Sequence, residues 1–187
     1  MRHDADFVPA LWDRIERWFA DHRPKLDLQL RPGAGEDAIA AAEQELGVPF
    51  PEDFRASLRV HDGQDDACEV TWLPFAQRLG SIASLVACWR DDRRDYDEAL
   101  GKERLDWLDD ERRVRQVHLH PGHIPFAGSA YWDYDRLLLD FVPGPEGSDG
   151  QIIARNDIHL RYVAPNFAAL LARLAAGLEN GTIRIPS

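Results

Sequence analysis

The sequence predicts a single α+β domain over residues 1–187, in which N-terminal helices and a C-terminal helix flank a mixed, mainly antiparallel twisted sheet. Three observations predict this class. Apolar residues recur at helical spacing through the first half of the chain, fall into short strand-like segments in the second half, and return to helical spacing at the C-terminal end. Because the chain of 187 residues exceeds the commonest domain size of about 100–150, one domain with an insertion is expected rather than two domains.

The N-terminal half predicts a series of helices separated by turns. Residues 7–21 place apolar side chains three and four positions apart, which is typical of an amphipathic helix. A second apolar series ends at Leu46, and Gly47 follows as a residue suited to a left-handed helix C-cap. Pro51 then fits the first turn of a third helix, whose Phe54 lies on its apolar face.

The next segment is predicted to contain a strand, a helix and an insertion. Residues 68–75 can form a strand around Trp72, and Ser81 can cap a following helix. Residues 90–115 are dense in charges of both signs and contain few apolar positions. We expect them to form a charged helical insertion on the rim of the domain.

The second half predicts a β-meander followed by a final helix. The candidate strands cover residues 117–119, 124–127, 132–142, 151–153 and 158–162. Pro165 fits the first turn of the last helix, and Gly177 and the Asn180-Gly181 pair are expected to mark its end.

The composition limits the kinds of partner. A formal charge of −11 disfavours nucleic acid and anionic lipid, which Lys and Arg must neutralise, and suits a basic protein partner better. The same charge also serves solubility alone. No apolar segment suggests secretion or a membrane span, so a cytoplasmic protein is expected. Cys68 and Cys88 are interpreted as buried, reduced thiols.

Two motifs in the first half carry a resemblance to a known family. The first consists of Leu46, Gly47, Phe50, Pro51, Asp53 and Phe54, and the second of His61, Asp62, Gly63 and Gln64. This pattern resembles the SUKH superfamily, which contains the fungal Smi/Knr cell-wall-assembly regulators and many bacterial toxin-immunity proteins.

The second half extends the resemblance in the same order along the chain. Its matching segments are Ile124 to Ala127, Leu139-Asp140, Pro143-Gly144, Gly150 to Ile153, Ala164 to Phe167 and Leu178 to Gly181. The match spans roughly residues 36–181, with the charged segment 90–115 unmatched. One departure is the segment 128–135, where the family commonly has a glycine-rich turn and this chain has three aromatic residues and two carboxylates.

The resemblance implies a non-enzymatic protein-binding module with the α+β fold. The main hypothesis is an immunity protein that binds and occludes a cognate bacterial toxin of nuclease or deaminase type, with acidic side chains that mimic phosphate. The alternative is a scaffold or regulatory protein of cell-wall synthesis or envelope signalling. No cofactor is implied.

The candidate partner-binding residues lie in two polar segments. They are His61, Asp62, Gln64, Asp65, Asp66, Tyr131, Trp132, Asp133, Tyr134 and Asp135. Aromatic rings beside carboxylates are suited to binding a basic surface. Each segment also has a simpler interpretation: residues 61–66 as a helix-ending turn whose side chains bond to local backbone, and residues 131–135 as a strand alternating between core and solvent.

Motifs for catalysis are weak. His118, His120 and His123 are the one cluster that suggests a metal, which would make a metal-dependent hydrolase the third hypothesis, but the Pro121-Gly122 pair stands where such a site needs an acidic ligand. The sequence contains neither a nucleophile turn of the form GxSxG nor a phosphate-binding GxxxxGK loop. We therefore expect no catalytic residues.

Overall fold

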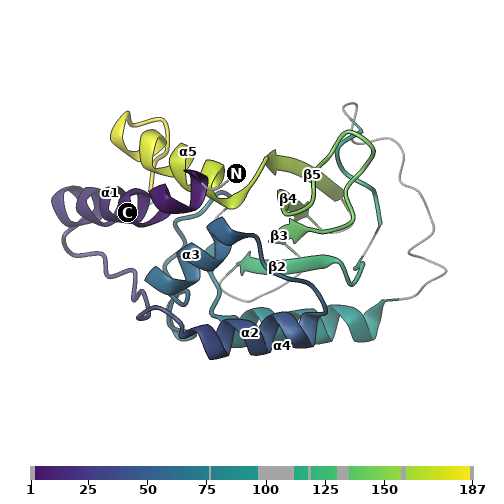
Figure 1. Ribbon diagram of the computed structural model, residues 1–187. Helices are drawn as coiled ribbons and strands as arrows, with labels where there is room; N and C mark the ends of the chain where they lie inside the picture. The colour runs from purple at the N-terminus through teal and green to yellow at the C-terminus, as the bar shows by residue number, and fades with distance from the viewer. Residues whose placement is uncertain are drawn as a thin grey trace.

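The computed structural model describes residues 3–75, 77–96, 112–117, 119–129, 135–156 and 159–185, with the backbone alone for residues 3–6. The helices are α1 (His3–His22), α2 (Glu36–Leu46), α3 (Glu52–Val60), α4 (Ile82–Asp95) and α5 (Phe167–Glu179). The strands are β1 (Arg78–Leu79), β2 (His123–Gly128), β3 (Arg136–Asp140), β4 (Gln151–Asn156) and β5 (His159–Ala164). Figure 1 shows the helices grouped to one side of the strands and below them.

The strands form one five-stranded sheet in the order β1-β2-β3-β4-β5. Each strand pairs antiparallel with the next, so the described sheet lacks the parallel pairs that a mixed sheet would contain. From β2 to β5 the strands follow one another along the chain without an intervening helix, as in a meander, whereas α4 lies between β1 and β2 in the sequence. The predicted α+β class is confirmed.

The predicted helix pair is confirmed at its boundary residue. Gly47 follows α2 in the left-handed conformation (φ 73°) and donates its backbone N–H to the carbonyl oxygen of Glu43 at 2.9 Å. The predicted end of the last helix at Asn180-Gly181 is confirmed, whereas its start lies two residues later than predicted. Asn166, rather than Pro165, flanks α5 and accepts the N–H of Ala169 with its side chain, and Gly177 lies inside the helix.

Two predicted strands are wrong. Residues 68–75 are irregular apart from a single bridge between Leu73 and Gln77, and the strand in this region is β1, two residues long. Trp72 and Leu73 resemble strand residues because both are buried, yet they pack into the core without a neighbouring strand. Val117 and Leu119 are likewise buried in irregular chain before β2.

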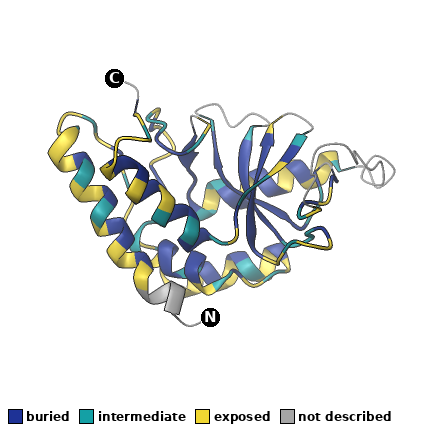
Figure 2. Ribbon diagram, turned by 90° about the horizontal axis from the view of Figure 1, so that it is seen from above, coloured by how far each residue is buried: buried dark blue, intermediate teal, exposed yellow. Residues whose placement is uncertain are grey.

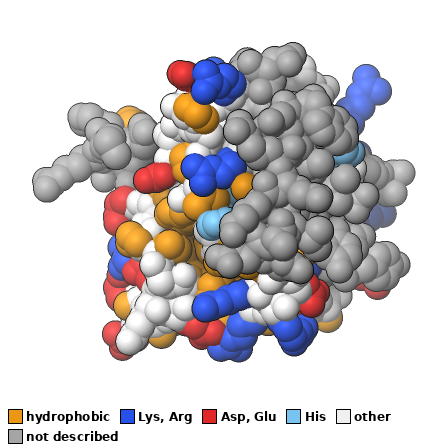
Figure 3. All heavy atoms as spheres, turned by 90° about the vertical axis from the view of Figure 1, so that its right-hand side faces the viewer, with side chains coloured by type: hydrophobic (Ala, Val, Ile, Leu, Met, Phe, Trp, Pro, Cys, Tyr) orange, Lys and Arg blue, Asp and Glu red, His pale blue; other side chains and the backbone are white. Residues whose placement is uncertain are grey.

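The two faces of the sheet are covered differently. Leu137 and Leu139 of β3 face the main core, to which all five helices contribute side chains. Leu138 between them faces the other way, where it packs with Ile153 and with Val114 from the segment before β2. The dark, buried strands of Figure 2 reflect this double cover, which explains why every residue of β3 is buried. Figure 3 views the molecule from the side of the second face.

The predicted insertion divides into three parts. Residues 90–95 belong to α4, residues 112–115 lie against the second face of the sheet, and residues 97–111 are outside the described residues. Cys68 and Cys88 are both buried and reduced, as predicted. No helix in the described ranges combines the length and the apolar character that crossing a lipid bilayer requires.

Candidate partner-binding surface

The start of α3 holds other elements in place. Asp53 is buried, and its Oδ1 accepts the backbone N–H of Phe54 at 2.9 Å, while Oδ2 accepts the backbone N–H of Ala168 at 2.8 Å. Ala168 lies in the first turn of α5, where N–H groups lack partners within the helix and the helix dipole favours a negative charge. Asp53 therefore fastens α3 to the N-terminus of α5.

Aromatic packing reinforces the same junction. The ring of Phe54 lies 5.1 Å from that of Phe50, 5.0 Å from that of Phe167 and 5.9 Å from that of Phe126, measured between centroids. The contacts with Phe50 and Phe167 are edge-to-face, the geometry that aromatic pairs prefer. Phe54 thus connects α3, α5 and β2.

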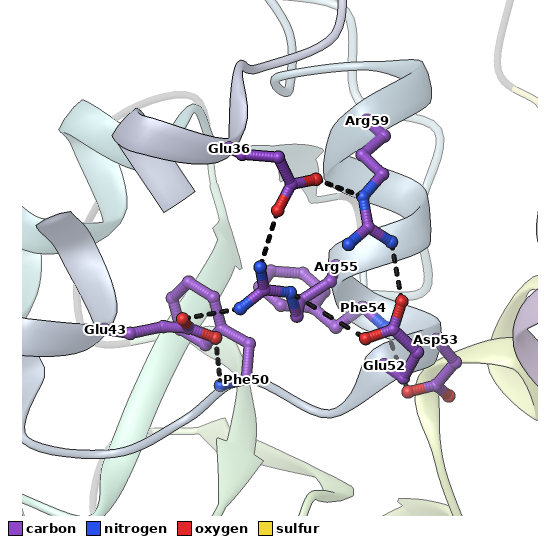
Figure 4. Close-up of polar contacts among 8 residues, drawn as sticks. All are labelled: Glu36, Glu43, Phe50, Glu52, Asp53, Phe54, Arg55 and Arg59. Carbon is purple, nitrogen blue, oxygen red and sulfur yellow. Dashed lines mark hydrogen bonds and ion pairs between the residues drawn. The ribbon is translucent and has the colours of Figure 1, made fainter. Parts of the chain in front are cut away.

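An ion-pair network covers the outer side of the α2–α3 pair (Figure 4). Arg55 donates to Glu43 and to Glu36, each at 2.6 Å, and Arg59 donates to Glu36 and to Glu52. Hydrogen bonds from Arg59 and Arg55 lower the pKa of Glu36. Because these charges are paired with one another, we expect them to orient the two helices rather than to contact a partner.

The turn after α3 begins with two side chains that join separate elements. The Nε2 of His61 lies 2.9 Å from Glu16 of α1, and its ring meets that of Trp12 edge-on at 4.9 Å. The Oδ1 of Asp62 accepts the backbone N–H of Ile82 at 2.7 Å, at the N-terminus of α4. The predicted bonding to local backbone is found at Asp65, whose Oδ1 accepts the backbone N–H of Ala67 at 2.9 Å, whereas Asp62 reaches a distant element.

Gln64 is a buried centre of hydrogen bonding, with no exposed surface. Its Nε2 donates to the carbonyl oxygens of Leu28 and Val70 at 2.9 and 3.0 Å. Its Oε1 accepts from Nε1 of Trp72 at 3.0 Å and from the backbone N–H of Leu79 at 2.8 Å. Because Gln64 lies inside the protein, its predicted direct contact with a partner is corrected: it positions the turn instead.

A polar pocket opens beside this turn. It has a volume of about 280 Å³ and is lined by Asp66, Arg78, Ser84, Ala87, Cys88, Asp91 and Arg136. Asp66 accepts a hydrogen bond from the Ser84 hydroxyl at 2.5 Å. Asp65, Asp66 and Asp91 are exposed, and we call these three residues the acidic rim. Among the predicted contact residues, Asp65 and Asp66 are therefore available to a partner.

The inner wall of the pocket is cationic. The strand register aligns Arg78 of β1 with Gly128 of β2, Gly128 with Arg136 of β3, and Arg136 with Arg155 of β4. Gly128 contributes no side chain to this row, which leaves room between Arg78 and Arg136. All three arginines are buried, with exposed fractions of 3%, 6% and 1%. Two of them, Arg78 and Arg136, line the pocket, which therefore combines an acidic rim with a cationic base.

Asp92 of α4 anchors this arginine row. Its Oδ1 accepts from Arg136 at 2.7 Å and its Oδ2 accepts from Arg155 at 2.9 Å. Asp92 is itself buried, and its two ion pairs compensate for the contacts with solvent that its carboxylate has lost. Burial also raises the pKa of the neighbouring Cys88 thiol to about 11.

The second predicted segment reaches the same pocket. Asp135 is half-buried and directly precedes Arg136, which lines the pocket together with Asp66. The structure thus brings the end of this segment close to the turn after α3. The other four candidates, Tyr131, Trp132, Asp133 and Tyr134, lie outside the described residues. Their role stays a prediction.

Comparison with known protein families identifies the fold. The model of the SMI1 / KNR4 family (SUKH-1) matches residues 33–173. This chain belongs to the SMI1/KNR4 (SUKH-1) family. The resemblance inferred from the sequence motifs is confirmed, and the matched region extends from the turn before α2 into α5.

Several of the curated relatives are fungal regulators. The chain is 34% identical over 186 residues to the cell wall biosynthesis/cell cycle regulator smi1 of Schizosaccharomyces pombe, covering 93% of the chain and 36% of that protein. It is 26% identical to a glucan synthesis regulatory protein of Neurospora crassa and 27% identical to the cell wall assembly regulator SMI1 of Saccharomyces cerevisiae. These alignments cover 93% and 91% of the chain. The chain spans 36–40% of the length of these relatives.

The proposed metal cluster of this SUKH-1 chain is not assembled in the described structure. His123 is buried in β2 with its Nε2 3.5 Å from Asp140, and the ring of His120 lies 5.9 Å from that of His123. Burial, followed by the nearby His123, lowers the pKa of His120. Among the described residues, no group of three potential ligands could hold a metal ion. His118 lies outside them.

Sequence reasoning missed the cationic base of the pocket. Arg78, Arg136 and Arg155 are far apart in the sequence and meet only through the strand register. One signal was present: the sequence of β3, Arg-Leu-Leu-Leu-Asp, places charged residues at both ends of an apolar run. A charge at the end of a buried strand needs a partner, and Asp92 supplies it.

Proposed function

We propose that this SUKH-1 chain is a non-enzymatic protein-binding module that acts as a scaffold or regulator in cell-wall or envelope synthesis. The named fungal relatives support the regulatory role. The observation that carries the binding role is the acidic rim: Asp66 and Asp91 line the polar pocket, Asp65 is exposed next to Asp66, and both predicted contact segments lead to this pocket.

The rim is suited to recognise a basic surface. Its carboxylates attract Lys and Arg side chains over a distance of about 10 Å at moderate salt. This attraction raises the rate at which the chain and a basic partner associate. The side chains that hold the turn in place (His61, Asp62 and Gln64) keep the rim in a fixed position before binding. A partner that meets a preorganised surface loses less entropy, so the buried network supports binding without contacting the partner.

The test is a charge reversal at the rim with a matched control. Asp65→Lys/Asp66→Lys changes the charge of the rim, and Asp13→Lys/Asp21→Lys makes the same change at exposed positions on α1. Proteins captured from the source cells by the wild-type chain are purified, and their affinity for each variant is measured by surface plasmon resonance. We expect the rim variant to bind about tenfold or more weakly, and the control to bind normally.

Two results would contradict this proposal. One is equal affinity of the rim variant and the wild-type chain for every captured partner. The other is turnover of a substrate by the purified chain, because the proposal assigns no reaction to it.

A toxin-immunity role is a second candidate, favoured by the formal charge of −11 and by the acidic rim. It predicts that co-expression of the chain protects cells from one toxin domain with a basic active-site cleft. The regulatory role predicts instead that the captured partners belong to cell-wall or envelope synthesis. The identity of the captured partner therefore separates the two candidates.

A further inference from the structure

An apolar groove lies between residues 74–75, the end of β5 and α5. It has a volume of about 350 Å³, and its lining includes Phe75, Val163, Leu170, Leu174 and Ile183. None of its lining residues belongs to the polar pocket. The groove is therefore a second surface, and what it binds goes beyond the function proposed above.

The C-terminal segment forms one wall of the groove. Ile183 folds back over α5 and donates its backbone N–H to the carbonyl oxygen of Gly177 at 2.9 Å. A Cβ atom at Gly177 would lie 2.5 Å from Cδ1 of Ile183, so a larger residue there would displace the Ile183 side chain. This hydrogen bond and the close packing at Gly177 hold Ile183 against α5.

Phe75 presents an apolar ring at the edge of the groove under backbone strain. The turn is closed by Leu73, whose N–H donates to the carbonyl oxygen of Gln77 at 2.9 Å. Phe75 has a left-handed backbone (φ 65°) and leaves 53% of its surface exposed. A bulky residue in this conformation costs free energy, and an exposed ring recovers little of it by burial. The arrangement points to a ring that gains its contacts from a ligand.

The charges around the groove are positive, although the chain as a whole is acidic. The guanidinium of Arg161 lies 5.6 Å from the centre of the Phe75 ring, Arg173 lines the groove, and Arg184 follows Ile183. The nearby carboxylate of Glu179 is paired with Arg14 at 2.6 Å. Within the described part of the chain, no Asp or Glu lines the groove.

We propose that this groove binds a segment of a partner protein that inserts an apolar side chain beside Phe75 and pairs its own carboxylates with Arg161 and Arg173. The volume is near the lower end of the range for ligand sites, about 300–1,000 Å³, and suits one large side chain with its neighbours. The cationic edges select acidic flanking residues, opposite in charge to the partner that the acidic rim selects.

The experiment uses the full chain and two synthetic peptides. Both carry a central Trp-Leu pair, flanked by Glu residues in one peptide and by Lys residues in the other. NMR titration is expected to shift the signals of Val163 and Leu174 with the acidic peptide, which should bind about tenfold or more tightly than the basic one. Arg161→Glu/Arg173→Glu should reverse this preference.

Two variants separate binding from folding. Phe75→Asn removes the ring with a residue that tolerates the left-handed conformation, so the melting temperature should be unchanged or higher, while affinity falls about tenfold or more. Phe7→Ala removes another exposed ring, which lies on α1, and should leave affinity unchanged.

Three results would overturn the proposal. The first is no signal shift at peptide concentrations up to about 1 mM, the range of weak affinities. The second is equal binding of the acidic and basic peptides. The third is self-association of the chain that Phe75→Asn abolishes in sedimentation, because a second copy would then occupy the groove.

Discussion

Asp62 and Asp66 are four residues apart in one turn, yet their carboxylates act in different directions. Asp62 points inward to the first N–H of α4, whereas Asp66 lies on the exposed rim of the polar pocket. The same contrast separates the buried residues of the two family motifs, such as Asp53 and Gln64, from the acidic rim. The residues that identify the family fix the positions of helices, and the residues available to a partner lie beside them.

The proposed function therefore assigns family membership and partner choice to different residues. Asp53, Asp62 and Gln64 each satisfy backbone groups of distant elements, so replacing them disturbs the fold. The rim carboxylates mainly meet solvent and local groups, so they can be exchanged at little cost in stability. Substitutions in the two groups of residues test this separation.

Asp92→Ala should have the largest effect. The change leaves Arg136 and Arg155 without the carboxylate that binds both of them in the buried base of the pocket. We expect the free energy of unfolding to fall by about 3–5 kcal/mol in urea denaturation. The adjacent exposed Asp91→Ala is the control, with a change of about 0.5 kcal/mol or less. Equal effects at both positions would show that Asp92 does not anchor the arginine row.

Gln64→Leu should come next. Leucine fits the buried volume but leaves the N–H groups of Trp72 and Leu79 and two carbonyl oxygens without their partner. The expected loss is about 3 kcal/mol, measured by the same denaturation. Gln44→Leu, at an exposed position of α2, provides the control. If Gln64→Leu lowered the free energy of unfolding by less than about 1 kcal/mol, the hydrogen bonds of Gln64 would contribute little to the stability of the fold.

Asp53→Ala should destabilise by about 1–2 kcal/mol, the usual cost of removing a helix cap. The backbone N–H of Ala168 loses its acceptor, so its hydrogen exchange should also accelerate. Asp53→Asn keeps an acceptor oxygen and should lose less. If both variants lost the same stability, the negative charge rather than the hydrogen bond would fasten α5.

Cys88 gives a smaller, pH-dependent effect. The pKa of this thiol is about 11 in the folded protein and 9.0 for the ordinary thiol, because burial disfavours the thiolate. The unfolded chain therefore loses its proton first, and the stabilising difference is complete below pH 9 and lost as pH rises through 11. Between these values the wild-type chain should lose more stability than Cys88→Ala in thermal denaturation. Equal losses of stability by the two proteins over this pH range would indicate that Cys88 is an ordinary, accessible thiol.

The sequence predicted the fold well where local chemistry decides it. Gly47 ends α2 because the left-handed position after a helix favours glycine, and Ser81 caps α4 by accepting the N–H of Ser84. The expected strand at 68–75 failed for a physical reason: burial of Trp72 and Leu73 produces a strand-like composition, whereas strand formation also needs a neighbour to pair with.

The candidate site was predictable only at its surface. Asp65 and Asp66 were identified because consecutive acidic residues in a polar turn are usually exposed. Gln64 looked equally polar, but its partners come from residues 28, 70, 72 and 79, which no local pattern brings together. The arginine row depends on the register of four strands, and register becomes visible only in three dimensions.

The most direct test of the separation compares two variants of the same turn in two assays. The free energy of unfolding and the affinity for the purified partner are measured for Asp62→Ala and for Asp65→Lys/Asp66→Lys. We predict that Asp62→Ala loses about 1–2 kcal/mol of stability and weakens binding much less than the rim variant does, and that the rim variant keeps its stability but binds about tenfold or more weakly. The opposite pattern, with affinity lost at Asp62 and retained at the rim, would contradict this separation.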